Sequence, residues 1–194
     1  FPFRVGLYPG ISCMYECTFC GRNYTAKYKR NALDAGIETY KKLIDEAPND
    51  DKNRFYISGG LEPLTNPKLG EIISHLKKKN FNSSMYTNGY MLTKKFLNKN
   101  PEIFDLDSLR ISFYGIDSEQ YFKVTKKIKS FEIVTKNIED YLNLKFNSNS
   151  KTTFGLNFVI LTGREKDVIK LVKLMENINK KIKLKKNNNF DFLT

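Results

Sequence analysis

The stretch Cys13-Met14-Tyr15-Glu16-Cys17-Thr18-Phe19-Cys20 contains all three cysteines of the 194-residue chain. Three thiols this close together on one loop can surround a small inorganic cluster, and thiolates are the usual ligands of iron–sulfur clusters. A cubane cluster has four irons, so three cysteines leave one iron without a protein thiolate. The spacing therefore predicts a cluster with one iron open to a substrate.

Other uses of these cysteines are less favoured. The odd number argues against a disulfide framework. A structural zinc site needs a fourth ligand, and the only histidine, His75, lies beside the apolar stripe of a distant helix, where we expect it at the surface. A non-catalytic iron–sulfur or zinc module for electron transfer or structure is a further alternative. The open iron argues against it, because electron-transfer clusters normally have every iron ligated.

Apolar runs of strand length alternate with segments of helical period on both sides of the cysteines, which predicts repeated βα units and a parallel sheet. The cysteines fall in a loop, residues 10–30, after the first strand. Strands are expected at residues 4–9, 54–58, 81–87, 108–113, 152–161 and 190–193. Helices are expected at residues 33–46, 93–98 and 130–144. Another is expected to begin with Asn66 as its N-cap and Pro67 at its first helical position. The last predicted helix carries the apolar stripe of Val168, Leu171, Val172, Met175 and Ile178.

Right-handed crossovers place every loop that follows a strand at the same end of such a sheet. We therefore predict a partial (βα)6 barrel of the TIM type, with its functional site at the carboxyl ends of the strands. Residues 1–194 are expected to form a single domain. The chain begins at Phe1 and stops at Thr194, just after the start of the sixth predicted strand. We expect it to be a fragment of a longer chain, truncated in the C-terminal part of the barrel.

The cysteine loop resembles that of the radical S-adenosylmethionine (SAM) superfamily, in the spacing of Cys13, Cys17 and Cys20 and in Phe19 and Gly21 around the last cysteine. The resemblance implies that the cysteines hold a [4Fe–4S] cluster and that Phe19 lies in the cofactor site. It implies that SAM chelates the fourth iron and is cleaved reductively to methionine and a 5′-deoxyadenosyl radical. The radical would take a hydrogen atom from the substrate of a lyase or oxidoreductase.

The resemblance continues through the chain. Ser58-Gly59-Gly60-Leu61-Glu62-Pro63-Leu64 is similar to the family's Gly-Gly-Glu-Pro segment, with Leu61 inserted. It implies that Gly59 and Gly60 approach SAM with their backbone and that Glu62 belongs to the same site. Thr87-Asn88-Gly89 resembles the motif at the end of the family's third strand, which implies that Asn88 lies at the SAM pocket. Ser112 matches the position of a family hydroxyl that contacts the ribose of SAM. Residues 159–161 would contact adenine, and residues 114–121 resemble the segment that opens the fourth helix.

Two substrate classes fit this enzyme. The run of residues 6–12 and the Gly-Gly-Leu-Glu-Pro sequence most resemble radical SAM enzymes that act on sugar nucleotides, which favours a small-molecule substrate. The formal net charge of +12 keeps an RNA-modifying enzyme as the alternative, although dispersed lysines are more often a solvated surface. The family implies an electron donor such as flavodoxin or ferredoxin. No apolar run approaches the roughly 20 residues of a membrane span, and no secretory signal is visible, so we expect a cytoplasmic protein without a membrane partner.

Overall fold

The computed structural model describes residues 1–21, 36–182 and 192–193. Its six strands lie within the segments predicted from the sequence, with ends shorter by up to three residues. The fourth strand has the predicted bounds. The strands are β1 (Val5–Leu7), β2 (Phe55–Ile57), β3 (Ser84–Thr87), β4 (Ser108–Phe113), β5 (Thr153–Phe158) and β6 (Phe192–Leu193).

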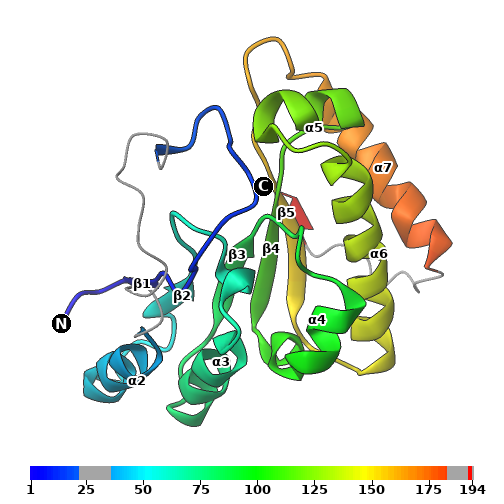
Figure 1. Ribbon diagram of the computed structural model, residues 1–194. Helices are drawn as coiled ribbons and strands as arrows, with labels where there is room; N and C mark the ends of the chain where they lie inside the picture. The colour runs from blue at the N-terminus through cyan, green and yellow to red at the C-terminus, as the bar shows by residue number, and fades with distance from the viewer. Residues whose placement is uncertain (22–35, 183–191, 194) are drawn as a thin grey trace.

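All six strands are parallel and follow one another across the sheet in sequence order. The register pairs Val5 with Phe55 at one edge and Arg110 with Gly155 near the other. Within the described residues β1 pairs only with β2, and β6 only with β5, so the sheet is an open part of a barrel (Figure 1). The predicted partial parallel barrel is confirmed.

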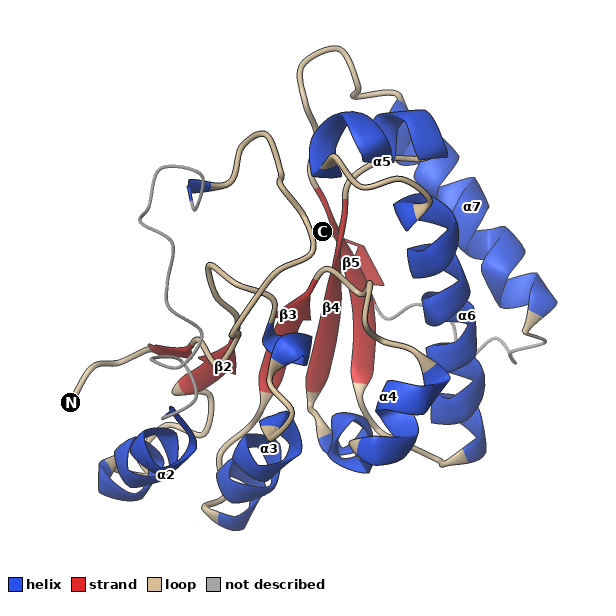
Figure 2. Cartoon of the chain, viewed as in Figure 1, coloured by secondary structure: helices blue, strands red, loops and turns tan. Residues whose placement is uncertain are grey.

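The helices lie along one face of this sheet (Figure 2). They bury one continuous apolar core against the strands. The α-helices are α2 (Gly36–Glu46), α3 (Leu69–Lys78), α4 (Lys94–Lys99), α5 (Ser118–Thr125), α6 (Ser130–Asn147) and α7 (Asp167–Lys181), and the 3-10 helices are η2 (Pro63–Thr65) and η3 (Pro101–Asp105).

Strand β4 shows how the sheet presents polar groups on its other face. Leu109, Ile111 and Phe113 are fully buried, whereas the residues between them are only half-buried. Successive side chains of a strand point to opposite faces, so Ser112 lies on the face away from the apolar residues, near the carboxyl end of the strand. Figure 1 shows the chain segment after β1 passing over this end of the sheet.

The predicted start of α3 is wrong. The helix begins at Leu69, and its N-cap residue, Lys68, makes no side-chain cap. The side chain of Asn66 instead accepts a hydrogen bond from the N–H of Lys68 at 2.9 Å and donates one to the carbonyl of Pro9, also at 2.9 Å. Asn66 therefore joins the end of η2 to the loop after β1, a contact across 57 residues that no local pattern reveals.

The last predicted helix is present as α7, but its apolar stripe is only partly buried. Leu171, Met175 and Ile178 are in the core, whereas Val172 is 42% exposed. The predictions for residues 22–35 and 183–191, including the start of the first helix at residue 33, lie outside the described residues. No helix in the described part of the chain is long and apolar enough to cross a bilayer.

Candidate active site

The loop after β1 that carries the cysteines is fastened to the loop after β2. The backbone N–H of Glu62 donates to the carbonyl of Ser12 at 2.9 Å, and the hydroxyl of Thr65 accepts from the N–H groups of Ile11 and Ser12 at 3.0 and 3.1 Å. Gly10 lies so close to the Leu61–Glu62 backbone that a Cβ there would come within 2.7 Å of it. These contacts fix the position at which the cysteine segment begins.

The opposite side of the cysteine loop is fastened to the end of α5. The N–H groups of Glu16 and Thr18 donate to the carbonyls of Thr125 and Val124, both at 3.0 Å, and a tight turn brings the N–H of Cys20 to the carbonyl of Cys17 at 3.0 Å. The ring of Tyr15 is buried beneath the loop. It packs edge-on against Tyr90 and Tyr114, at centroid distances of 5.7 and 6.0 Å.

One cleft brings the three cysteines together with most of the residues assigned to SAM by resemblance. Segments after β1, β2 and β3 and the end of β4 contribute to it. The cleft is open to solvent, and its volume of about 130 Å³ is smaller than that of most small-molecule pockets. Its lining includes Cys13, Cys17, Cys20, Gly59, Gly60, Glu62, Asn88 and Ser112.

Glu62 is the buried carboxylate of this cleft. It accepts hydrogen bonds from the N–H groups of Asn88 and Leu64, at 2.8 and 3.1 Å, and from the hydroxyl of Thr87. Burial raises the pKa of Glu62 because a low-dielectric environment disfavours the anion, and the three hydrogen bonds partly oppose that shift. The chain's own donors thus occupy this carboxylate, which makes Glu62 a brace between the loops after β2 and β3.

Asn88 connects that brace to the cysteine loop. Its Nδ2 donates to Sγ of Cys13 at 3.8 Å and to Sδ of Met14 at 3.2 Å, while its Oδ1 accepts from the N–H of Tyr90 at 3.0 Å. The residue is 5% exposed. The amide is therefore held in one orientation beside the first cysteine.

The two glycines after β2 differ in what their backbone requires. Gly59 has φ +148°, a conformation that residues with a Cβ rarely adopt. Gly60 has no neighbouring atom within 4 Å of a Cβ built on it, so it borders open space in the cleft. Gly59 thus has a local backbone reason to be glycine, and Gly60 leaves room for a ligand.

Ser112 and Tyr114 bring β4 and its following loop to the cleft. The pKa of Tyr114 is raised, first by burial and then by the nearby thiol of Cys17, and a hydrogen bond with Ser112 partly offsets the shift. The sequence analysis assigned Ser112 but gave no site role to the tyrosines of the lining, Tyr15, Tyr86 and Tyr114. The alternation of β3 could have shown that Tyr86 shares a sheet face with Ser84.

The structure does not bring every predicted contact to the cleft. Phe19 is 48% exposed and is not part of the lining, although its ring lies 6.0 Å from that of Tyr114. Ile160 and Leu161 follow the end of β5 and are exposed. The assignments of Phe19 to the cofactor site and of residues 159–161 to adenine stay predictions.

The three cysteines are free thiols and line the same cleft. Among the described residues no three His, Cys, Asp or Glu side chains lie close enough together to hold a single metal ion. A cubane requires no such arrangement, because each thiolate binds a different iron. His75 on α3 pairs with Asp45 of α2 at 3.0 Å in a partly exposed contact, and its side chain is 17% exposed. The donor set fits a [4Fe–4S] cluster.

Comparison with protein families gives one match that covers most of the chain. The model described as "Radical SAM superfamily" matches residues 7–175. This range includes all three cysteines and every residue of the cleft lining.

Curated relatives of two kinds are among the matches. The chain is 37% identical over 179 residues to dTDP-4-amino-4,6-dideoxy-D-glucose ammonia-lyase of Streptomyces venezuelae, which covers 92% of this chain and 37% of the relative. It is 32% identical over 141 residues to a probable GTP 3′,8-cyclase of Methanococcus maripaludis, covering 71% of this chain and 44% of the relative. The chain therefore spans less than half the length of these relatives.

Solved structures share the fold. SuiB of Streptococcus suis superposes with a TM-score of 0.65 at 17% identity, covering 91% of this chain and 38% of that one. A structure of TYW1 with a lysine-pyruvate adduct bound gives a TM-score of 0.60 at 18% identity, covering 91% and 62%. At this identity the likeness concerns the path of the chain alone.

Proposed function

The chain belongs to the radical SAM superfamily, and from this premise we propose that it carries the cluster- and SAM-binding part of an enzyme acting on a small molecule. The observation that carries the proposal is the convergence of three free cysteines, two glycines, Asn88 and Ser112 on one cleft at the carboxyl ends of the strands. Parallel α/β folds place their ligand sites at this end of the sheet.

We assign the cluster to the thiolates of Cys13, Cys17 and Cys20. When bound, the cluster and SAM supply one-electron cleavage of the sulfonium bond, which yields methionine and a 5′-deoxyadenosyl radical. The chain's own contribution is to hold the three thiols in place. The hydrogen bonds of Ser12, Glu16 and Thr18 to neighbouring elements fasten residues 12–18 on both sides, through contacts that need no ligand.

We assign SAM to the remaining polar lining of the cleft. Gly60 leaves space for a ligand beside the backbone, Asn88 presents an oriented amide, and Ser112 presents a hydroxyl on the open face of β4. Glu62 acts indirectly, by fixing the backbone of Asn88. Buried polar groups that are fully hydrogen-bonded hold a site rigid, so we expect SAM to meet a preformed surface.

A sugar nucleotide is the substrate class that the relatives support best. The 37% identical relative is named for a dTDP-amino sugar, and the second relative for GTP. Both names contain a nucleotide and not a polymer. We extend the proposal to a one-electron donor such as flavodoxin or ferredoxin and to a reducing, cytoplasmic location, because free thiols persist in such compartments. The charge of +12 keeps RNA as the competing substrate.

The first experiment tests the cluster. Anaerobic reconstitution of the full-length protein should incorporate about four irons per chain, and Cys13→Ala, Cys17→Ala or Cys20→Ala should each reduce this to near zero. Thr18→Ala is the matched control, because this exposed side chain lies in the same loop and only its backbone makes the contact to Val124. Iron binding that persists in the cysteine variants, or tight stoichiometric zinc in the parent, contradicts the assignment.

The second experiment tests the substrate class. The reconstituted protein, SAM and a chemical reductant are incubated with dTDP-4-amino-4,6-dideoxy-D-glucose, with GTP or with transfer RNA, and 5′-deoxyadenosine is measured by liquid chromatography. We expect a sugar nucleotide to raise its rate of formation. Stimulation by transfer RNA alone would replace the small-molecule proposal with the RNA-modifying one.

A further inference from the structure

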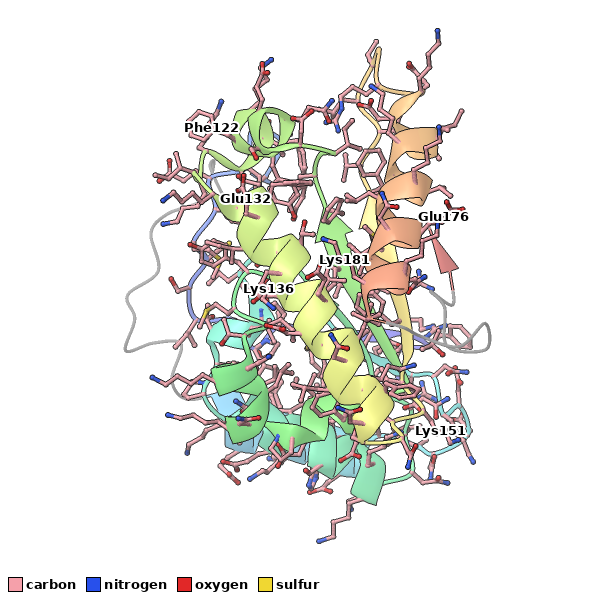
Figure 3. All side chains as sticks on the ribbon, turned by 90° about the vertical axis from the view of Figure 1, so that its right-hand side faces the viewer. Phe122, Glu132, Lys136, Lys151, Glu176 and Lys181 are labelled. Carbon is pink, nitrogen blue, oxygen red and sulfur yellow. The ribbon has the colours of Figure 1, made fainter. Side chains whose placement is uncertain are left out.

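Helix α6 carries a buried amide within its apolar stripe. Val134, Ile138 and Tyr141 are fully buried, and Asn137 lies between them at the same helical spacing with only 5% exposure. Figure 3 views this helix from outside, with the exposed Lys136 along it. Burying an amide is unfavourable unless hydrogen bonds satisfy it. The partners of Asn137 therefore show what this side chain does in the core.

Those partners are the two carbonyls that follow Asn88 at the end of β3. Nδ2 of Asn137 donates to the carbonyl of Gly89 at 3.0 Å and to that of Tyr90 at 2.9 Å. The carboxylate of Glu62 accepts from the N–H of Asn88 at 2.8 Å. Residues 88–90 are thus held at one end by the loop after β2 and at the other by α6.

The same three residues contact the cysteine loop at two points. Nδ2 of Asn88 donates to Sγ of Cys13 at 3.8 Å, and its Oδ1 accepts from the N–H of Tyr90 at 3.0 Å. The ring of Tyr90 packs edge-on against that of Tyr15, with the centroids 5.7 Å apart. The direction of the Asn88 amide therefore depends on where the backbone of Tyr90 lies, and Asn137 fixes that backbone.

We infer that Asn137 is a positioning residue that holds the Asn88 amide as a hydrogen-bond donor to the Cys13 thiolate, and that this donor raises the reduction potential of the cluster. The inference rests on the proposed function, because it requires a cluster bound to Cys13. Hydrogen bonds to the ligating sulfurs are among the factors that set iron–sulfur potentials. Reduction adds one negative charge to the cluster. An N–H group directed at the sulfur stabilises that charge, so it favours the reduced state.

Two variants of Asn137 remove its donors in different ways. Asn137→Leu replaces the amide by an apolar side chain of similar size. Asn137→Ser is the second variant if the leucine protein does not fold, because a serine hydroxyl can bond a carbonyl of its own helix. Asn143→Leu is the matched control, since Asn143 is an exposed asparagine of the same helix whose amide donates to the carbonyl of Glu139, at 2.8 Å. Asn88→Ala removes the donor to Cys13 itself.

The midpoint potential of the cluster is the measurement. The reconstituted full-length proteins are titrated without SAM and followed by electron paramagnetic resonance, after the iron content of each variant has been matched to that of the parent. At a fixed potential, Asn88→Ala should lower the ratio of reduced to oxidised cluster about fivefold, the effect of one net hydrogen bond. This corresponds to about 40 mV, at 59 mV for each tenfold change in a one-electron couple. Asn137→Leu should shift the ratio in the same direction, and Asn143→Leu should leave it unchanged.

A double variant tests whether Asn137 acts through Asn88. The protein with both Asn88→Ala and Asn137→Leu should have the potential of Asn88→Ala alone, because coupled residues are not additive. Additive shifts overturn the inference, and so does a folded Asn137 variant with the parent's potential. A parent protein that gives no reducible iron–sulfur signal contradicts the proposed function instead. A parent cluster whose potential does not respond to Asn88→Ala contradicts only the inference.

Discussion

The carboxylate of Glu62 accepts a 2.8 Å hydrogen bond from the backbone N–H of Asn88, so the loop after β2 and the end of β3 share one buried charge. The side chain of the same Asn88 reaches Sγ of Cys13. Glu62 is therefore linked to the first cysteine through a single residue. The pairing explains how a buried carboxylate that already accepts three hydrogen bonds from the chain can still influence the candidate site.

Replacing Glu62 by glutamine should destabilise the fold. The carboxylate satisfies the donors of Leu64, Thr87 and Asn88, whereas glutamine presents one oxygen and one NH2 group, which would face a backbone N–H. A buried donor left without a partner costs about 1–3 kcal/mol. Urea denaturation of Glu62→Gln under anaerobic conditions should show a loss of free energy of unfolding in this range.

Glu71→Gln is the matched control for that measurement. Its carboxylate lies at the surface of α3, where it pairs with Lys41 at 2.9 Å. Surface substitutions usually change stability by no more than about 0.5 kcal/mol. If Glu62→Gln is as stable as this control, the three hydrogen bonds to Glu62 do not brace the loops as described.

The glycines offer a second matched pair. In Gly10→Ala the new Cβ would lie 2.7 and 2.8 Å from backbone atoms of Leu61 and Glu62, which cannot move without shifting the loop after β2. Overpacking of this kind costs about 1–3 kcal/mol. Gly60→Ala meets no atom within 4 Å, so its thermal stability should match the parent. Its methyl group should instead weaken SAM binding in calorimetry, and unchanged SAM affinity would place Gly60 outside the SAM site.

The contrast between local and long-range structure decides which features the sequence could predict. Strand β4 was predicted with its observed bounds because its apolar and polar residues alternate with period two. The start of α3 was predicted wrongly. The side-chain oxygen of Asn66 accepts from the N–H of Lys68, much as a cap would, but a turn follows and the helix begins only at Leu69. The side-chain nitrogen of Asn66 bonds to the carbonyl of Pro9, a partner that only the folded chain supplies.

The same limit applies to the candidate site. Gly59, Gly60 and Asn88 follow strands, and strand ends of parallel sheets meet at one edge, so their convergence follows from topology. The inserted Leu61 departs from the family segment through which Glu62 was assigned, yet the structure places this carboxylate in the cleft lining. Its hydrogen bonds to Thr87 and Asn88 cross 25 and 26 residues. Neither spacing nor composition contains that information.

The pH dependence of stability should report a polar cluster around Asp167. Burial tends to raise the pKa of this carboxyl, but hydrogen bonds from Arg164, Gln120 and Lys170 outweigh it, so the pKa lies below its usual range. A depressed pKa means that the folded state binds the proton less readily than the unfolded chain. The stabilisation is therefore present above the ordinary Asp pKa of about 3.9 and is lost as pH falls below it.

Asp167→Asn removes this stabilisation. At pH 7 the variant should unfold at a lower urea concentration than the parent, because Arg164 loses its ion pair of 3.1 Å. The difference should narrow as pH falls from 5 toward 3. Asp105→Asn is the comparison, since Asp105 makes no ion pair among the described residues. If the difference in stability between Asp167→Asn and the parent does not change with pH, the pKa of Asp167 is the same in the folded and unfolded states.

The most direct prediction concerns SAM and Ser112. With a strong reductant the reconstituted full-length protein should slowly release 5′-deoxyadenosine and methionine even without substrate, because one iron lacks a protein ligand and iron–sulfur potentials extend to about −700 mV.

Ser112→Ala should weaken SAM binding by about 1 kcal/mol, or roughly fivefold, if one neutral hydrogen bond is lost. Ser108→Ala is its control, because Ser108 lies on the same face at the other end of β4 and its hydroxyl has no hydrogen-bond partner among the described residues. Equal SAM affinity in both variants would remove Ser112 from the site. A cluster-loaded protein that binds no SAM would instead favour the electron-transfer alternative, because the open iron would then have no ligand to activate.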